Sequence, residues 1–432
     1  MEPLPLFKRI VIGLGALAII TIAAIFGLAW QPAISPIVPP PVASFAPDLV
    51  ARGQVLAGAG YCATCHTRKG GAPLAGGLGL KTAFGTVYSV NITPDVETGI
   101  GGWSLPAFTR AMHTGVARDG SQLLPAFPYD HFTKVSDADV AAIYAWLMTR
   151  PAVHAPATSN TVPFPLNIRA LQGVWKRLFF REGRFQPDAA KGAEWNRGAY
   201  LAQGLSHCGG CHTPRNRLGA EQADAANAGA VIDGWIAPSL TETNPAPVAW
   251  NTDELFTYLR TGVTELHGSA AGPMSPVVHD GLAALPDTDV RAIAVYLASG
   301  NGSASQPVDA AAAWTKALAR APGTDPDARL YAAACGSCHY NAGPVPSLTR
   351  PELALNSALY LSEPTNFIQV VLHGIGVREG APKLIMPAYD RALGDADIAR
   401  LAAYLRRTRT SLPPWPDLEA KVAAVRKEAT AG

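Results

Sequence analysis

The stretch Cys62-Ala-Thr-Cys65-His66 returns twice along the chain, as Cys208-Gly-Gly-Cys211-His212 and as Cys335-Gly-Ser-Cys338-His339. These three stretches hold all six cysteines of the 432 residues, and a histidine always follows the second cysteine. Cys-x-x-Cys-His is the attachment signature of c-type haem. Two thiols at this spacing reach two vinyl groups on one porphyrin edge, and the adjacent imidazole then faces the iron. The sequence therefore predicts three covalently bound haem c groups, with iron ligands His66, His212 and His339.

Two other uses of paired cysteines fit this pattern less well. A redox dithiol of the thioredoxin kind needs one Cys-x-x-Cys unit and no histidine after it. A zinc site can be built from paired Cys-x-x-Cys units, but it does not require a histidine after every second cysteine. Because the pattern uses every cysteine and always includes the histidine, haem attachment is the favoured interpretation.

The repeat extends beyond the motif. Each motif is followed by a helix-like stretch that ends in glycine, at 103–115, 250–262 and 363–374. A second helical stretch then opens with aspartate, at Asp137, Asp287 and Asp395. Aspartate at a helix start accepts hydrogen bonds from free N–H groups and complements the helix dipole. An aromatic residue lies nine positions after each aspartate, as Trp146, Tyr296 and Tyr404.

This order of elements is that of a small mono-haem cytochrome c domain: helix, motif, loop, helix, ligand loop and C-terminal helix. The predicted fold class is therefore all-α, with three tandem class I cytochrome c domains. Hydrophobic residues make up 48% of the chain and charged residues 16%, so each domain can bury a core. The formal charge of +2 argues against a nucleic-acid partner, which would require a basic surface.

The N-terminus predicts a membrane helix. Lys8 and Arg9 precede an uncharged run of 21 residues, from Ile10 to Trp30, and about 20 residues suffice to cross a bilayer. A cleaved secretory signal has a shorter apolar region, of about 7–15 residues, and tryptophan favours the membrane interface. An uncleaved signal anchor is therefore expected, with a cleaved signal as the alternative. The cationic flank stays in the cytoplasm, which predicts the bacterial inner (cell) membrane, with the haem domains on the periplasmic side.

These features divide the chain into seven parts: a signal-anchor helix (1–30), a Pro-rich linker (31–47), cytochrome c domain 1 (48–155), an inter-domain segment (156–190), cytochrome c domain 2 (191–302), cytochrome c domain 3 (303–412) and a C-terminal tail (413–432). The inter-domain segment interleaves aromatic and basic residues at 162–182. Such a helix either lies at a membrane surface or packs against the first haem domain, and the second interpretation is favoured.

Two methionines lie twelve residues after the helix-ending glycine, Met274 after Gly262 and Met386 after Gly374. A thioether is a good axial partner for histidine because it raises the haem potential. The alternative is that both are core methionines that fill gaps. Their identical register and their neighbouring prolines favour Met274 and Met386 as sixth iron ligands.

The same count in the first repeat leads from Gly115 to Phe127, which cannot bind iron. The first haem therefore uses another sixth ligand or leaves that position open. His131 is the nearest candidate in the same loop and would give bis-histidine ligation. Three other candidates lie on the predicted helices, namely Met112, His113 and Met148.

Residues 48–408 resemble the triple-haem cytochrome c subunits of bacterial membrane-bound dehydrogenases. The resemblance rests on the motifs above and on the stretches FGTVYSVNITPD at 84–95, ETGIGGWS at 97–104, PFPLNIR at 163–169, EWNRGAYL at 194–201 and HCGGCHTPRN at 207–216. It implies that Cys62, Cys65, Cys208, Cys211, Cys335 and Cys338 bind haem covalently. His66, His212 and His339 would then be proximal ligands, and Met274 and Met386 distal ones. The partner implied is a dehydrogenase catalytic subunit: a quinoprotein, a flavoprotein or a molybdenum hydroxylase.

The chain departs from the family at Phe127, where members paired with alcohol dehydrogenases usually have methionine. The loop PAFPYDHF at 125–132 looks more like the cytochromes paired with molybdenum hydroxylases. We predict a membrane-tethered, non-catalytic electron-transfer subunit that passes electrons from the dehydrogenase to ubiquinone, a soluble cytochrome or a terminal oxidase. The alternative function is a peroxidase-like haem enzyme that uses an open first haem.

Overall fold

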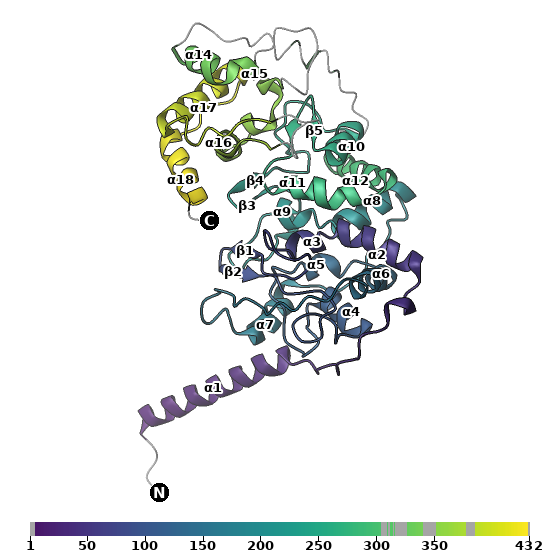
Figure 1. Cartoon of the computed structure of the whole chain (residues 1–432). Helices are drawn as coiled ribbons and strands as arrows, with labels where there is room; N and C mark the ends of the chain where they lie inside the picture. The colour runs from purple at the N-terminus through teal and green to yellow at the C-terminus, as the bar shows by residue number, and fades with distance from the viewer. Residues whose placement is uncertain are drawn as a thin grey trace. The chain divides into compact units, whose positions relative to one another are not determined.

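The computed structural model of the protein describes residues 5–303, 309, 312–313, 315, 326–339, 351–376 and 385–430. These residues are mostly helical and divide into two compact units (Figure 1). Unit 1 comprises Met1–Ala57 and Cys62–Gln186, and unit 2 comprises Gly58–Tyr61 and Pro187–Gly432. The predicted domain 303–412 is described only in part, because 340–350 after the third motif and 377–384 in the ligand loop lie outside the described residues.

Unit 1 begins with the long apolar helix α1 and contains the first motif. Its elements are α1 (Leu6–Ala29), a 3-10 turn (Val42–Ser44), α2 (Pro47–Ala59), α3 (Cys62–Cys65), β1 (Gly79–Thr82), β2 (Gly85–Tyr88), α4 (Leu105–Thr114), α5 (Tyr129–Phe132), α6 (Asp137–Met148) and α7 (Arg169–Phe179). The predicted Pro-rich linker is extended and lies along this unit, where the Ile34 N–H donates to the carbonyl of Arg118 (2.8 Å) and the Ile37 N–H to that of Gly102 (3.0 Å).

Unit 2 contains the second and third motifs. Its first half holds α8 (Ala193–Gln203), α9 (Gly209–His212), β3 (Ala230–Ile232), β4 (Trp235–Ala237), α10 (Thr252–Thr261), β5 (Val263–Thr264), β6 (Gly268–Ser269), α11 (Met274–Pro276) and α12 (Asp287–Gly300). Its second half holds α14 (Pro326–Tyr331), a π-helical turn (Ala332–Gly336), α15 (Ser337–His339), two 3-10 turns (Leu353–Leu355 and Ser357–Leu359), α16 (Thr365–His373), α17 (Asp395–Arg409) and α18 (Leu418–Thr430).

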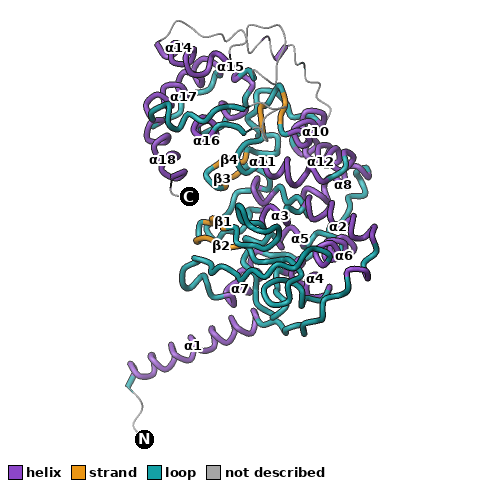
Figure 2. The backbone as a smooth tube through the Cα atoms, in the orientation of Figure 1, coloured by secondary structure: helices purple, strands orange, loops and turns teal. Residues whose placement is uncertain are grey.

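The described residues are mostly helical, as predicted, and three short antiparallel hairpins accompany the helices there (Figure 2). In the first hairpin Gly79 pairs with Tyr88, and in the second Ala230 pairs with Ala237. The strands are two to four residues long, which is too short to show the alternating pattern that identifies a strand in a sequence.

The helices that end in glycine are confirmed. Helices α4, α10 and α16 stop at Gly115, Gly262 and Gly374, whose φ angles are +63°, +81° and +73°. Glycine adopts this left-handed conformation without steric cost, so it closes the helix. The helix starts follow from capping, since the Ser104 side chain accepts a hydrogen bond from the Ala107 N–H and the Asn251 side chain accepts one from the Glu254 N–H.

In the first two repeats, the helix before the motif crosses the last helix at a glycine. A Cβ atom on Gly53 would lie 1.9 Å from the carbonyl oxygen of Ala142, and one on Gly198 would lie 1.8 Å from that of Ala292. The preceding residue forms an ion pair with the last helix each time. The Arg52 Nε donates to Asp139 (2.9 Å), and the Arg197 Nε donates to Asp289 (2.8 Å).

The third repeat uses the reverse pair, because Arg400 on the last helix donates to Asp327 on the first (2.9 Å). Its core also takes in the predicted C-terminal tail. Trp415 joins Tyr331 and Tyr404 in one buried cluster, and Val422 of α18 packs in a second. The tail predicted at 413–432 therefore contains a helix that belongs to the core of the third repeat.

Side-chain amides on α16 hold the edge of strand β4. The Asn366 side chain accepts a hydrogen bond from the Ile236 N–H (2.7 Å) and donates one to the Ile236 carbonyl (2.8 Å). Gln369 donates to the carbonyl of Gly234 (3.0 Å). The second and third repeats are thus joined by bonds of the kind that a neighbouring strand would make.

We expect Gly198→Ala to lower the free energy of unfolding by about 1–3 kcal/mol, because the new methyl group overpacks a helix crossing against a backbone carbonyl that cannot rotate away. Chemical denaturation of the haem-loaded protein, followed by helical circular dichroism, measures the change. Gly192→Ala is the matched control, because a Cβ atom there meets nothing within 4 Å. Equal stability of the two variants would contradict the close crossing.

Candidate haem-binding sites

Each motif forms a tight helical turn. The His66 N–H donates to the Cys62 carbonyl (2.9 Å), and the His212 N–H donates to the Cys208 carbonyl (3.0 Å). All six cysteines are free thiols. Burial, followed by the neighbouring thiol of the motif, raises the pKa of Cys62 and Cys208 to about 12 and that of Cys335 to about 11.

The surroundings of Cys62, Cys208 and Cys335 do not favour the thiolate form. A redox dithiol and a zinc ligand both act as thiolates and lie where the pKa is lowered, whereas burial here raises it. Within the described ranges, no cysteine belongs to a group of three or more His, Cys, Asp or Glu residues whose ligand atoms lie within 4.8 Å of one another. The motif cysteines are half-buried except for Cys338, which is exposed, and their paired thiols suit thioether formation with an apolar porphyrin edge.

The three motif histidines share one hydrogen bond. Each Nδ1 lies close to a backbone carbonyl oxygen: Val90 for His66 (2.6 Å), Pro238 for His212 (2.7 Å) and Pro351 for His339 (3.0 Å). Because a carbonyl oxygen only accepts, Nδ1 must carry the proton, and Nε2 keeps its lone pair. Histidines that bind metals donate their other ring N–H to such a partner, which sets the tautomer and the ring orientation.

Burial also lowers the pKa of His66, His212 and His339, although the carbonyl bond opposes the shift. The imidazoles are therefore neutral at physiological pH, and neutral imidazole is the form that binds iron. The proton position and the neutral state together fit axial ligation through Nε2 at all three motifs.

The sequence offers little sign of the three carbonyl partners. Val90 follows strand β2 and Pro238 follows β4, so the two hairpins carry these carbonyls to the histidines. A backbone acceptor has no side-chain signature. The repeated Pro-Ser-Leu-Thr at 238–241 and 346–349 does not identify these partners, because the acceptor for His339 is Pro351.

The structure places Phe127 in the register of Met274. The Ala270 N–H donates to the Gly262 carbonyl (2.6 Å) four residues before Met274, and the Leu123 N–H donates to the Gly115 carbonyl (2.8 Å) four residues before Phe127. Met274 starts helix α11. In the third repeat Met386 pairs with Ile375 through two backbone bonds and packs against a buried apolar cluster.

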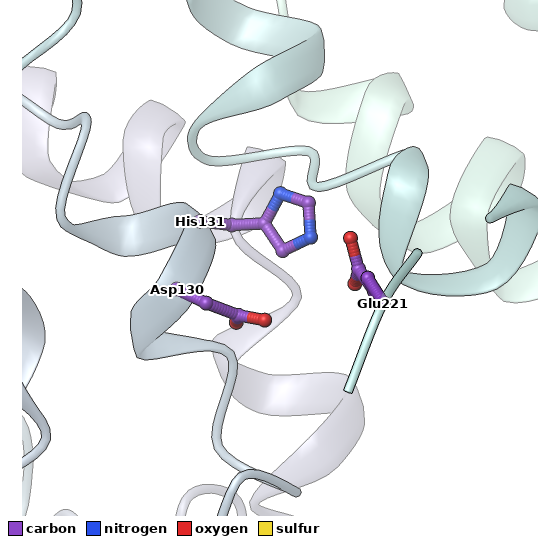
Figure 3. Close-up of side chains that lie close together, drawn as sticks. All are labelled: Asp130, His131 and Glu221. Carbon is purple, nitrogen blue, oxygen red and sulfur yellow. The ribbon is translucent and has the colours of Figure 1, made fainter. Parts of the chain in front are cut away.

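The first repeat has an aromatic pair where the second has a thioether. The Phe127 ring contacts the Phe132 ring edge-on, with centroids 5.3 Å apart. His131 is buried on the short helix α5, next to Asp130, and Figure 3 shows both side chains extending from it.

The other candidate ligands of the first haem lie in the helical core. Met112 and Met148 are buried among apolar residues of α4 and α6. The ring of His113 is occupied at Nε2, which donates to the Val135 carbonyl (3.0 Å). That bond occupies one ring nitrogen of His113, and the other, Nδ1, lies 3.6 Å from a carboxylate oxygen of Asp137. His131 as the sixth ligand of the first haem stays a prediction.

Lys176 of α7 holds the ligand loop of the first repeat, which is the loop after α4 that contains Phe127 and His131. The sequence did not reveal this role. Its Nζ donates to the carbonyls of Thr114 (2.7 Å) and Gly115 (2.6 Å) and to Oε1 of Gln122 (2.8 Å), and lies 4.5 Å from the ring centre of Tyr129. Burial lowers the pKa of Lys176 to about 7. The inner face of the predicted inter-domain helix therefore packs against the first repeat.

Comparisons with known proteins find relatives along most of this chain. The family described as Cytochrome c matches residues 50–151, and the one described as Cytochrome C oxidase, cbb3-type, subunit III matches residues 324–405. The fructose dehydrogenase cytochrome subunit of Gluconobacter japonicus is 37% identical over 395 residues, which cover 86% of this chain and 81% of the relative. The gluconate 2-dehydrogenase cytochrome c subunit of Pantoea cypripedii is 39% identical over 403 residues, which cover 88% and 90%.

A third relative is a subunit of the nicotinate dehydrogenase of Pseudomonas putida, which is 45% identical over 418 residues. The match covers 94% of this chain but spans only 35% of that relative.

Replacing one cysteine pair by alanine, as in Cys62→Ala with Cys65→Ala, is expected to lower the mass of the denatured protein by one haem and to leave the other two attached. The physical reason is that only thioether bonds survive denaturation. Intact-mass spectrometry measures the change, and the corresponding pairs at 208/211 and 335/338 act as controls for one another. If any of the three variants kept the mass of all three haems, the motif changed in it would not be an attachment site.

Proposed function

Because this chain belongs to the family of cytochrome c subunits of dehydrogenases, we propose that it is a membrane-tethered tri-haem electron carrier. It takes electrons from a partner periplasmic dehydrogenase and passes them to ubiquinone, a soluble cytochrome or a terminal oxidase. The chain itself makes and breaks no substrate bond.

The observation that carries this proposal is the bond from Nδ1 of each motif histidine to a backbone carbonyl. It holds His66, His212 and His339 in one tautomer, with Nε2 available as the proximal ligand. When bound, haem c supplies a one-electron ferric/ferrous couple. The six cysteines would hold the group in place.

The sixth ligands set the potential of each site. Met274 and Met386 would supply thioethers, which raise the potential, whereas His131 would give bis-histidine ligation and a lower one. His131 is the proposed sixth ligand of the first site because Phe127 occupies the methionine register there. The same observation supports the second candidate function, a peroxidase-like enzyme, if His131 does not close the first site.

The membrane tether is proposed from α1. Residues Leu6–Gly27 have a mean hydropathy of 2.6 and are not buried within the protein. A helix of this length and composition is able to span a bilayer. With the cationic end in the cytoplasm, the haem domains lie on the periplasmic side of the bacterial inner membrane.

The partner is proposed to be a molybdenum hydroxylase, with a quinoprotein or a flavoprotein as the other classes. The support comes from the Phe127 loop and from the 45% identity to a subunit of nicotinate dehydrogenase, since nicotinate is an N-heterocyclic acid. Quinoproteins and flavoproteins are retained as partner classes because relatives of this chain are subunits of fructose and gluconate dehydrogenases.

Carbon monoxide tests the ligand of the first site. We expect the reduced wild-type protein to bind none, because three six-coordinate irons leave no open position. His131→Ala should bind carbon monoxide at one haem in three. Adding Phe127→Met should close that site again and, in the oxidised protein, increase the charge-transfer band of methionine ligation. Absorption difference spectra provide the measurement. Binding by the wild type, unchanged in His131→Ala, would support the peroxidase-like function instead.

Met386→Ala is expected to reduce electron flow from the native dehydrogenase to a quinone severalfold, because losing the thioether lowers the potential of the third site. Quinone reduction by the solubilised complex under steady-state conditions measures the flow. Met148→Leu is the matched control, because Met148 is buried in the core of the first repeat. Unchanged flow in Met386→Ala would place the third haem outside the path.

A further inference from the structure

Helix α7 has two different faces. Its inner face is buried and includes Gln172, Gly173 and Lys176. On the opposite face Leu171 and Val174 are half-buried, whereas Leu178 is 59% exposed. These three apolar residues recur at helical spacing and form a stripe that is half-buried at Leu171 and Val174 and exposed at Leu178.

Basic side chains border this stripe. Arg177 and Arg181 are both exposed, and the guanidinium of Arg181 donates to the carbonyl of Arg177 (3.3 Å). The nearest acidic residue in sequence, Glu182, lies 3.9 Å from Arg184. An apolar stripe flanked by arginines is typical of helices that lie in a membrane interface.

The segment before α7 adds more exposed apolar surface. Phe164 is 79% exposed and Leu166 is 38% exposed. Both residues are close in sequence to α7, and clusters of exposed apolar side chains mark contact surfaces.

The position of α7 identifies the contact. Ala29, the last residue of α1, is buried against α7, and a Cβ atom on Gly173 would lie 2.6 Å from its Cα atom. The carbonyl of Ala29 accepts a hydrogen bond from Gln122 (2.6 Å), whose Oε1 binds Lys176. Figure 1 shows α7 beside the C-terminal end of α1. Helix α7 therefore lies where α1 would leave the bilayer.

We propose that the outer face of α7 and the segment 163–168 form a second membrane contact, lying in the headgroup layer of an anionic bilayer. Leu178, Phe164 and Leu166 enter the acyl boundary, and Arg177 and Arg181 face lipid phosphates. This inference rests on the proposed tether α1. Through Lys176, the contact holds the ligand loop of the first repeat at the lipid surface, where a lipid-soluble acceptor is concentrated.

Photo-cross-linking to lipid tests the contact in the full, haem-loaded chain. Because the six native cysteines become thioethers, an introduced cysteine is the single free thiol and can carry a benzophenone. The label is placed at Leu178→Cys, at Phe164→Cys, at Gly13→Cys on α1 and at Leu218→Cys. Leu218 is the matched control, since it is 57% exposed. Nanodiscs of phosphatidylcholine and phosphatidylglycerol supply the bilayer.

We expect lipid adducts by mass spectrometry at 178, 164 and 13, and none at 218. Adducts at 13 without adducts at 178 and 164 would overturn the contact and leave the tether intact. Absence of an adduct at 13 would overturn the tether and, with it, this inference. Equal adducts at 178 and 218 would also overturn it, because the labelling would then not distinguish this face.

Discussion

The site chemistry depends on a hydrogen bond from Nδ1 of a motif histidine to a backbone carbonyl. A histidine that follows Cys-x-x-Cys can rotate about its side-chain bonds, and only a second contact selects one ring orientation and one tautomer. In the first two repeats, a hairpin of very short strands delivers that contact after Val87 and Ile236 have paired in their ladders. The hairpins therefore matter for the orientation of His66 and His212 more than for the size of any sheet.

Much of the architecture could be predicted from the sequence because it depends on the identity of particular side chains. The glycines that end α4 and α10, the aspartates in the first turn of α6 and α12, and the motifs themselves each have a local physical cause. The hairpins and the histidine acceptors could not be predicted in this way, because they are made by backbone groups. Lys176 was also missed, since a lysine among aromatics and arginines gives no sign that three oxygens will surround it.

The helix crossings show how one sequence plan tolerates variation. In two repeats a glycine allows close approach, and an arginine on the first helix pairs with an aspartate on the last. In the third repeat the charges exchange sides, with Asp327 on the first helix and Arg400 on the last. The ion pair between the two helices is kept in all three repeats, but the positions of arginine and aspartate are exchanged in the third. A search for identical residues at equivalent positions therefore overlooks it. Phe127 is a similar case, because it keeps the backbone surroundings of Met274 but has a different side chain.

The hydrogen bonds that join Asn366 and Gln369 to strand β4 have a kinetic consequence for a chain that carries electrons. Tunnelling between two redox centres falls steeply with the gap between them, so a loosely joined pair of domains must wait for diffusion to bring its centres together. Asn366 and Gln369 bond to β4 as a neighbouring strand would, so the second and third repeats stay joined and no diffusion step is needed between their proposed haems. The rate of electron transfer between the proposed haems of the second and third repeats should therefore not depend on the viscosity of the medium.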